Sequence, residues 1–130
     1  MPIALITLVD QDRVWFKSHH GWDEQEVSRD VAFCTTTHPG VPEPWTIPDV
    51  TADPRTVDNP LVVGGPQVRS HAGAPLITRE GYDLGALCVF DHQPRTFTPQ
   101  QLATLADLAG LAMHEIEMRE AARRALFTGI

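Results

Sequence analysis

The sequence predicts an α+β domain, in which a long terminal helix covers one face of an antiparallel sheet. Two observations indicate this class. Apolar segments of strand length occur in pairs joined by short polar turns, as in consecutive β-hairpins. A single long segment with helical periodicity follows the last of these pairs. The chain has 130 residues, which is enough for one core, so we expect residues 1–130 to form a single domain.

The first hairpin is predicted from two apolar segments near the start of the chain. Ile3–Val9 is a continuous β-branched and aliphatic run, which is typical of a central strand with both faces buried. Residues 10–12 form a polar turn, and residues 13–18 form the returning strand. His19 and His20 follow, and neighbours on a strand point to opposite faces, so we expect no shared metal site from this pair.

The segment after the first hairpin has a weaker pattern. Residues 21–30 are acidic, and we expect them to be irregular. Residues 31–34 are apolar and are predicted to form one or two helical turns. Pro39-Gly40 must end this helical segment.

The next segment is rich in proline and is predicted to form an edge strand and a lid. Residues 45–47 have strand character, and the neighbouring prolines confine such a strand to the edge of a sheet. Residues 49–66 lack a clear period but contain turn or cap motifs at 53–55 and 58–60, with a short helix expected between them. A loop of this length in a small domain is usually functional, so we expect it to act as a lid.

The second hairpin lies at the centre of the prediction. It consists of strands at residues 68–78 and 83–91, joined by a turn that contains Gly81. Alternation along the first strand places Arg69, His71 and Gly73 on one face and Ser70, Ala72 and Ala74 on the other. We expect helices to cover one of these faces and loops over a cavity to cover the other, which is the layout of a binding module.

The clearest helix start in the sequence is at Thr98. Thr98 is predicted to be the N-cap, with Pro99 at the first helical position and Gln101 completing a capping box. The helix is expected to span residues 99–125. The stripe expected to face the sheet comprises Leu102, Leu105, Ala109, Ala112, Met113 and Ile116. Further apolar residues lie outside this stripe, namely Leu108, Leu111, Met118 and Ala122. They form either a wider core face or a seam against a second copy of the chain, and we favour the second interpretation.

Composition excludes several classes of function. The net charge of −7 argues against nucleic-acid binding, which needs clustered Lys and Arg. No apolar run approaches the length of a membrane span, and no basic region precedes the first apolar segment as in a secretory signal. Cys34 and Cys88 form no Cys-x-x-Cys pair, so we expect two reduced, buried thiols and a cytoplasmic location.

Taken together, these segments resemble GAF domains. The matching residues are Leu8-Val9-Asp10, Trp15-Phe16-Lys17-Ser18, Arg29-Asp30, Phe33-Cys34, Pro48-Asp49, Asp53-Pro54-Arg55, Asn59-Pro60-Leu61-Val62, Arg69, Ala72-Gly73-Ala74-Pro75-Leu76, Gly85-Ala86-Leu87-Cys88-Val89 and Pro94-Arg95. The branch they resemble occurs in bacterial sensor histidine kinases and in diguanylate cyclase or phosphodiesterase proteins. The resemblance implies an antiparallel sheet of five or six strands, a terminal helix on one face, and a ligand pocket on the other face under a lid at residues 33–68.

The chain departs from the family pattern in two places. Only residues 1–2 precede the first strand, where GAF domains usually have a helix. Either the chain is a fragment, or a partner chain covers the exposed part of the sheet. Ser70 and His71 stand where this branch tends to carry an aromatic pair, which implies a more polar or larger pocket.

The resemblance and the residue types together suggest a set of ligand-binding residues. The set comprises Arg29, Phe33, Cys34, Asp49, Arg69, His71 and Cys88. An arginine can bind a carboxylate or phosphate through its planar guanidinium. The alternative for Arg69 is an internal pair with Asp30 or Asp49 that holds the lid to the sheet. His71 is either a ligand contact or a core histidine, and the cysteines are either a redox pair or small buried apolar residues.

The predicted function is that of a regulatory domain in bacterial signal transduction, which senses a small molecule and couples pocket occupancy to a dimerising helix at 99–125. The sequence identifies neither the ligand nor a cofactor, and it contains no metal motif. The enzyme alternative is a thiol-based reductase of a small oxidised metabolite such as methionine sulfoxide, using Cys34 and Cys88. The third hypothesis is a scaffold that only dimerises. Signatures of cyclic-nucleotide-binding and tetrapyrrole-binding GAF domains are not found in the sequence.

Overall fold

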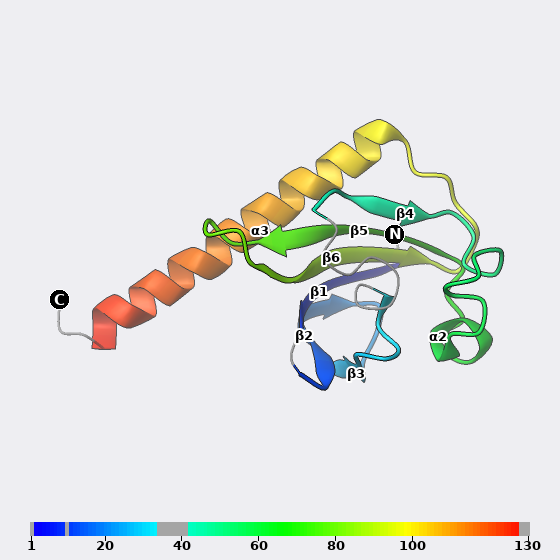
Figure 1. Ribbon diagram of the computed structural model, residues 1–130, viewed down its shortest axis with the longest axis horizontal. Helices are drawn as coiled ribbons and strands as arrows, with labels where there is room; N and C mark the ends of the chain where they lie inside the picture. Colours follow the sequence, from blue (N-terminus) through cyan, green and yellow to red (C-terminus); the bar gives the residue numbers. More distant parts are fainter. Residues whose placement is uncertain (1, 10, 34–41, 128–130) are drawn as a thin grey trace.

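The computed structural model describes residues 2–9, 11–33 and 42–127. Its strands form one antiparallel sheet in the order β3-β2-β1-β6-β5-β4 (Figure 1). The strands are β1 (Ile3–Val9), β2 (Arg13–His20), β3 (Glu26–Ser28), β4 (Trp45–Ile47), β5 (Ser70–Ile77) and β6 (Asp83–Asp91). The described helices are α2 (Pro60–Val63) and α3 (Pro99–Phe127). The predicted α+β class, with a terminal helix on an antiparallel sheet, is therefore confirmed.

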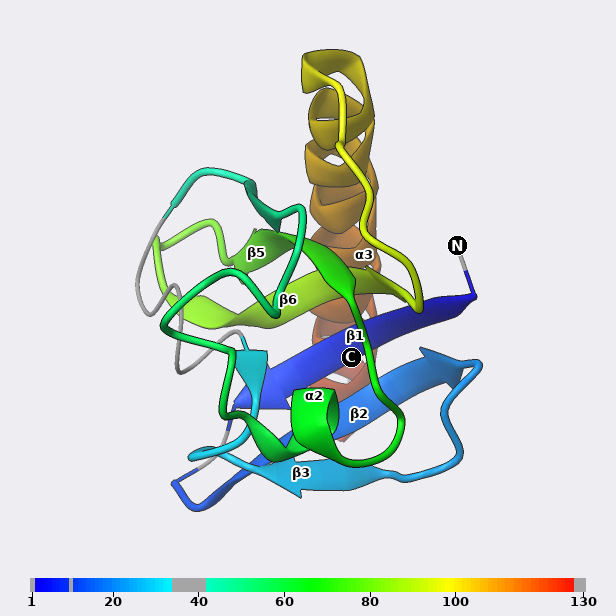
Figure 2. The same ribbon diagram turned by 90° about the vertical axis from the view of Figure 1, so that its right-hand side faces the viewer.

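The two faces of the sheet belong to separate apolar clusters. On one face, here called the helix face, Ala72, Ala74 and Leu76 of β5 pack against α3. On the other, here called the lid face, side chains of β1, β2, β4 and β6 pack against α2 and the segment from Val50 to Val68. Figure 2 shows α2 and α3 on opposite sides of the sheet. The expected alternation along β5 is confirmed, because Ala72 and Ala74 face α3 and His71 faces the opposite side.

Local chemistry fixes the start of α3 as expected. The Gln101 N–H donates to Thr98 Oγ1 at 3.1 Å, and the Thr98 N–H donates to Gln101 Oε1 at 2.9 Å, so the capping box is formed. The helix then crosses β5 and β6 and continues beyond the sheet to Phe127 (Figure 1). Its buried residues are Leu105, Ala109 and Met113, which belong to the predicted sheet-facing stripe.

The structure corrects the prediction in the middle of the chain. Residues 26–28 lie in a segment expected to be irregular, but they form β3, which pairs with β2. The short helix α2 does not lie between the two turn motifs; it begins directly after Asn59, whose side chain accepts from the Leu61 N–H. Cys34, the last residue of the helical turn expected at residues 31–34, lies outside the described part of the chain. The edge strand at residues 45–47 is confirmed as β4.

Smaller differences concern the ends and the burial of the strands. The strand β2 continues through His20, two residues further than expected, whereas β5 is shorter than predicted and begins at Ser70. The strand β1 has the predicted bounds, but only its lid face is fully covered: Ile3 and Leu5 are buried, whereas Ile6 and Leu8 are half-buried. The described helix on that side, α3, lies over β5 and β6, so β1 receives less cover.

Candidate functional site

A cluster of aromatic rings occupies the centre of the lid face. His71 of β5 is fully buried there, with its ring centroid 4.5 Å from that of Phe90 and 5.2 Å from that of Phe33. The indole Nε1–H of Trp45 donates to His71 Nε2 at 2.9 Å. Because Nε2 accepts this hydrogen bond, the neutral imidazole carries its proton on Nδ1.

The position of Trp45 depends on Gly73. Antiparallel pairing places Trp45 of β4 opposite Gly73 of β5. A Cβ atom at Gly73 would lie 2.5 Å from Cζ2 of the Trp45 indole, so the indole lies directly on the glycine backbone. The absence of a side chain at Gly73 therefore allows the indole to reach His71.

Arg69 links the lid segment to the sheet. Its guanidinium Nη1 donates to the backbone oxygen of Val62 in α2 at 3.0 Å and to that of Val68 at 2.9 Å. Asp49 lies within reach of the Arg69 charge. Its pKa is lowered chiefly by hydrogen bonds from the hydroxyl and the N–H of Thr51, with a smaller contribution from Arg69. The arrangement joins the lid segment to the sheet, as the alternative interpretation of Arg69 expected, although backbone carbonyls accept the hydrogen bonds that it donates.

The remaining predicted residues lie in different places. Cys88 is buried on the lid face of β6, where it is paired with Gly73 of β5 and Leu5 of β1. Arg29 is exposed and follows β3, at the opposite edge of the sheet from β4, with Nη1 3.5 Å from the Gln11 oxygen. Cys34 lies outside the described residues. The structure thus brings Phe33, His71 and Cys88 to one face and places Arg29 apart from them; their ligand-binding role stays a prediction.

Two residues of this face were not predicted as site residues. Trp45 was interpreted only as part of an edge strand, and Phe90 only as part of an apolar strand. The available signal was alternation, because Gly73 and His71 share a face of β5 and leave room for a large side chain from a neighbouring strand. Which side chain fills that room depends on the register between β4 and β5, which sequence patterns did not provide.

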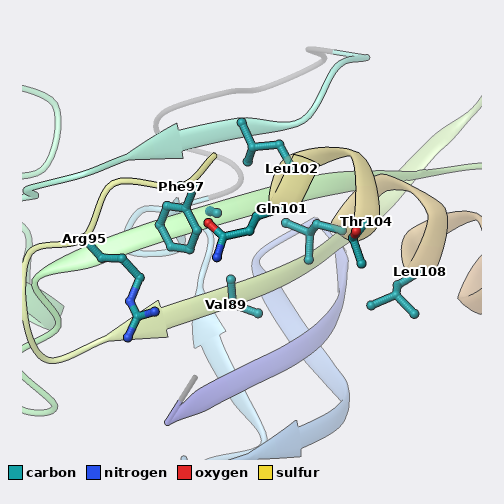
Figure 3. Close-up of a pocket in the computed structure, with 9 residues that line it drawn as sticks. Val89, Arg95, Phe97, Gln101, Leu102, Thr104 and Leu108 are labelled. Atoms are coloured by element: carbon teal, nitrogen blue, oxygen red, sulfur yellow. The ribbon is translucent and has the colours of Figure 1, made fainter. Parts of the chain in front are cut away.

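The helix face contains a groove of about 320 Å³ beside the first turns of α3 (Figure 3). Ala72 and Val89 form its floor, and its lining also includes Phe97, Leu102, Thr104, Leu105 and Leu108. Three polar side chains at the groove, Arg95, Gln101 and Thr104, already take part in hydrogen bonds within the chain. The groove therefore offers mainly apolar surface.

Several apolar side chains of α3 are exposed outside the stripe that packs on the sheet, and one of them, Leu108, also lines the groove. Leu108, Leu111 and Met118 are 50%, 66% and 52% exposed. They lie outside the stripe that packs on β5, so they are not part of a wider core face of this chain.

None of the helices within the described residues is long and apolar enough to cross a membrane. Within the same residues, no group of His, Cys, Asp or Glu side chains has the arrangement of a metal site.

Comparison with known proteins gives a consistent match. The model of the GAF domain family matches residues 2–116. A cyclic di-GMP phosphodiesterase of Pseudomonas aeruginosa is 42% identical over 116 residues, which is 88% of this chain and 20% of the relative. The chain thus spans about one fifth of the length of that relative.

Solved structures have the same fold at low sequence identity. The GAF domain of a phosphoenolpyruvate-protein phosphotransferase from Coxiella burnetii has a TM-score of 0.75 at 16% identity, over 95% of this chain and 76% of that chain. A free methionine-R-sulfoxide reductase from Neisseria meningitidis, solved with its substrate, has a TM-score of 0.73 at 19% identity, over 92% of this chain and 70% of that chain. At these identities the similarity concerns the fold.

Proposed function

This chain belongs to the GAF domain family, and from that premise we propose that it is the small-molecule-sensing module of a bacterial signalling protein, with a ligand site on the lid face and an output through α3. The observation that carries the proposal is the 42% identity to a cyclic di-GMP phosphodiesterase, a signalling enzyme, over nearly the whole of this chain. The domain acts by binding; catalysis belongs to other parts of such a protein.

The lid face supports the sensing role through its composition. It combines tilted and edge-on aromatic rings with one imidazole, that of His71, and within the described residues its cover consists of the four-residue helix α2 and the irregular segments beside it. Ligand sites are mostly apolar with a few well-placed polar groups. On the lid face Trp45 and His71 would supply such groups to a ligand that replaces the hydrogen bond between them. A ligand that binds beneath the lid segment would change the packing of Trp45 and α2, and a difference in affinity between two arrangements shifts their populations.

The ligand test begins with the purified protein. Native mass spectrometry is expected to detect a co-purified small molecule, and a thermal-shift screen with defined nucleotides, amino acids and their sulfoxides is expected to identify compounds that raise the melting temperature. Trp45→Leu is expected to lower the affinity for such a compound, whereas Tyr82→Leu at the exposed β5–β6 turn is the control. Absence of both bound mass and thermal shift over the whole screen would contradict sensing and favour a scaffold.

Support for a dimer comes from the spacing of the exposed residues on α3. The apolar residues Leu108, Leu111, Met118 and Ala122 fall on the alternating intervals of three and four that are typical of a helix pairing with another helix, and Thr104 and Glu115 occupy the remaining positions of that register. All six are exposed. Pairing with a second copy would cover Leu108, Leu111 and Met118 together.

Sedimentation velocity over a concentration series tests this dimer. Leu111→Glu places a charge at the centre of the seam and is expected to give a monomer. Val63→Glu is a matched control, because both side chains are 66% exposed and Val63 lies on α2. A chain that is monomeric at the highest concentration would contradict the dimer, as would equal association of the two variants.

The reductase hypothesis has weaker support. Cys88 is buried among apolar side chains, where the thiol rather than the reactive thiolate is favoured. The similarity to the Neisseria meningitidis reductase extends to the fold. Turnover of free methionine sulfoxide by the purified protein, lost in Cys88→Ala, would replace sensing by catalysis as the main function.

A further inference from the structure

Three segments of the chain meet where β6 leads into α3. We call this region the connector joint and define it by Pro48, Val50, Arg69, Ser70, Asp91, Gln93 and Arg95. Four hydrogen bonds hold it together: Arg95 N–H to Pro48 O at 3.0 Å, Val50 N–H to Arg69 O at 2.8 Å, Arg69 N–H to Asp91 O at 2.8 Å, and Ser70 Oγ to Gln93 O at 2.8 Å. The connector to α3 is thereby attached to the segment that follows β4 and to the start of β5.

Charged side chains add further contacts within the joint and connect it to the lid segment. The carboxylate of Asp91 accepts from Arg95 Nη2 at 2.8 Å and from Nε at 3.1 Å. The side chain of Asp91 is only 13% exposed, so this pair is better shielded than an ordinary surface pair. On the other side, the Arg69 guanidinium binds the backbone oxygen of Val62 in α2. The joint therefore contacts both β4, the edge strand that pairs with β5, and α2, which packs on the lid face.

The segment between the connector joint and α3 is short. Arg95 is followed after two residues by Thr98, whose capping box begins α3. Three residues span at most about 10 Å even when fully extended. Phe97, between Arg95 and Thr98, packs into the helix-face cluster, so this short segment is fixed at both ends. Figure 3 shows Arg95, Phe97 and Gln101 on the connector and the first turn of α3, all beside the same groove.

From this geometry we infer that the connector joint is the route by which a displacement of β4 or α2 on the lid face reaches the first turn of α3. Arg95 acts as a positioning residue, since its side chain holds the connector against Asp91 while its N–H holds Pro48. The biological meaning of this route rests on the proposed function, but the coupling itself requires neither a ligand nor a second copy of the chain.

A double-mutant cycle read by hydrogen exchange tests the inference. Trp45→Phe removes the indole N–H that binds His71 and so perturbs β4 three residues before Pro48. The measured quantity is the exchange rate of the amides at residues 101–103 in α3. Trp45→Phe is expected to increase this rate about five-fold in the otherwise unchanged protein, the lower end of typical coupling between sites. In an Arg95→Gln background the same substitution is expected to increase it less than about two-fold.

A control variant tests whether the effect is specific to the Arg95–Asp91 ion pair or follows from the loss of any arginine–aspartate pair. Arg55 binds Asp53 at 2.7 Å and is 44% exposed, similar to Arg95 at 46%, and both partners of this pair lie in the segment that follows β4. In Arg55→Gln the effect of Trp45→Phe is expected to remain about five-fold. Unchanged amide exchange rates in the β5–β6 hairpin verify that the faster exchange at residues 101–103 is local. If Trp45→Phe raises the exchange rates of the whole domain, Asn59→Ala in the cap of α2 is used as the perturbation instead.

Two outcomes would overturn the inference: no change at residues 101–103 on perturbing β4 or α2, or an equal change in the Arg95→Gln background. Either result leaves the ligand and dimer experiments unaffected. Conversely, a chain that binds no ligand can still show this coupling, so the two proposals fail separately.

Discussion

Adding one methyl group at Gly73 is expected to disturb the lid face more than its size suggests. A Cβ atom built at this position lies 2.5 Å from Cζ2 and 2.6 Å from Cε2 of the Trp45 indole. Real Cβ contacts are essentially never shorter than 3.0 Å, so the indole must move in Gly73→Ala. Because the same indole donates to His71 Nε2, this movement also breaks a buried hydrogen bond.

The magnitude follows from three contributions. Overpacking of a well-packed core costs about 1–3 kcal/mol. Loss of a buried hydrogen bond with one partner left behind costs about 1–3 kcal/mol. Replacement of glycine by alanine returns about 0.4–1 kcal/mol through the lower entropy of the unfolded chain. The sum is a decrease of about 3 kcal/mol in the free energy of unfolding for Gly73→Ala.

Urea denaturation followed by circular dichroism measures this free energy. The decisive comparison uses a Trp45→Leu background, in which no indole lies on Gly73. There Gly73→Ala is expected to change the free energy of unfolding by less than about 1 kcal/mol, because the steric conflict is gone. The reasoning is refuted if Gly73→Ala alone costs less than about 0.5 kcal/mol, or if its cost is the same in both backgrounds.

Three further substitutions test other parts of the structure. Gly110 is exposed in the middle of α3 with open space at its Cβ position, so Gly110→Ala is expected to stabilise the domain by about 1 kcal/mol in urea denaturation; a destabilised variant would contradict the helix. Asn59 both caps α2 and donates to Val31 O at 2.8 Å, so Asn59→Ala is expected to cost about 2 kcal/mol, against less than about 0.5 kcal/mol for the exposed neighbour in Asp58→Ala. Burial raises the pKa of Asp91, but hydrogen bonds from Arg95 and from the N–H groups of Gln93 and His92 outweigh it and hold the pKa below the ordinary 3.8. The stabilisation that ionised Asp91 gives to the folded state is therefore present above pH 3.8 and is lost as the pH falls through the lower folded-state pKa. In Asp91→Asn the free energy of unfolding is expected to fall less steeply with decreasing pH in this acidic range. An unchanged dependence on pH would contradict this assignment.

Local chemistry explains which elements were predictable from the sequence. Thr98, Pro99 and Gln101 form a motif whose partners lie within four residues, so the start of α3 was predicted correctly. The strands Ile3–Val9 and Asp83–Asp91 have apolar runs long enough to fix their bounds. By contrast, β3 has three residues and a single apolar side chain, Val27, which is too short for any period to be visible.

The candidate site was less accessible to sequence reasoning. The hydrogen bond between Trp45 and His71 joins residues that are 26 positions apart, and it depends on a register that places Trp45 opposite Gly73. The Arg69 guanidinium was predicted to bind a ligand or, alternatively, to pair with Asp30 or Asp49, and in the structure it donates to the carbonyl oxygens of Val62 and Val68. Backbone acceptors leave no trace in the sequence, because every residue carries one.

Because α3 extends past the sheet, a small rotation at its start produces a larger displacement at its far end. A helix of 29 residues is about 43 Å long, so a pivot of about 5° at its capped end moves the far end by about 4 Å. The stretch of helix that contributes least to the core is thus the stretch that enlarges the movement. A small rotation near the sheet thus becomes a displacement of about 4 Å at the far end of α3, about three quarters of one helical turn.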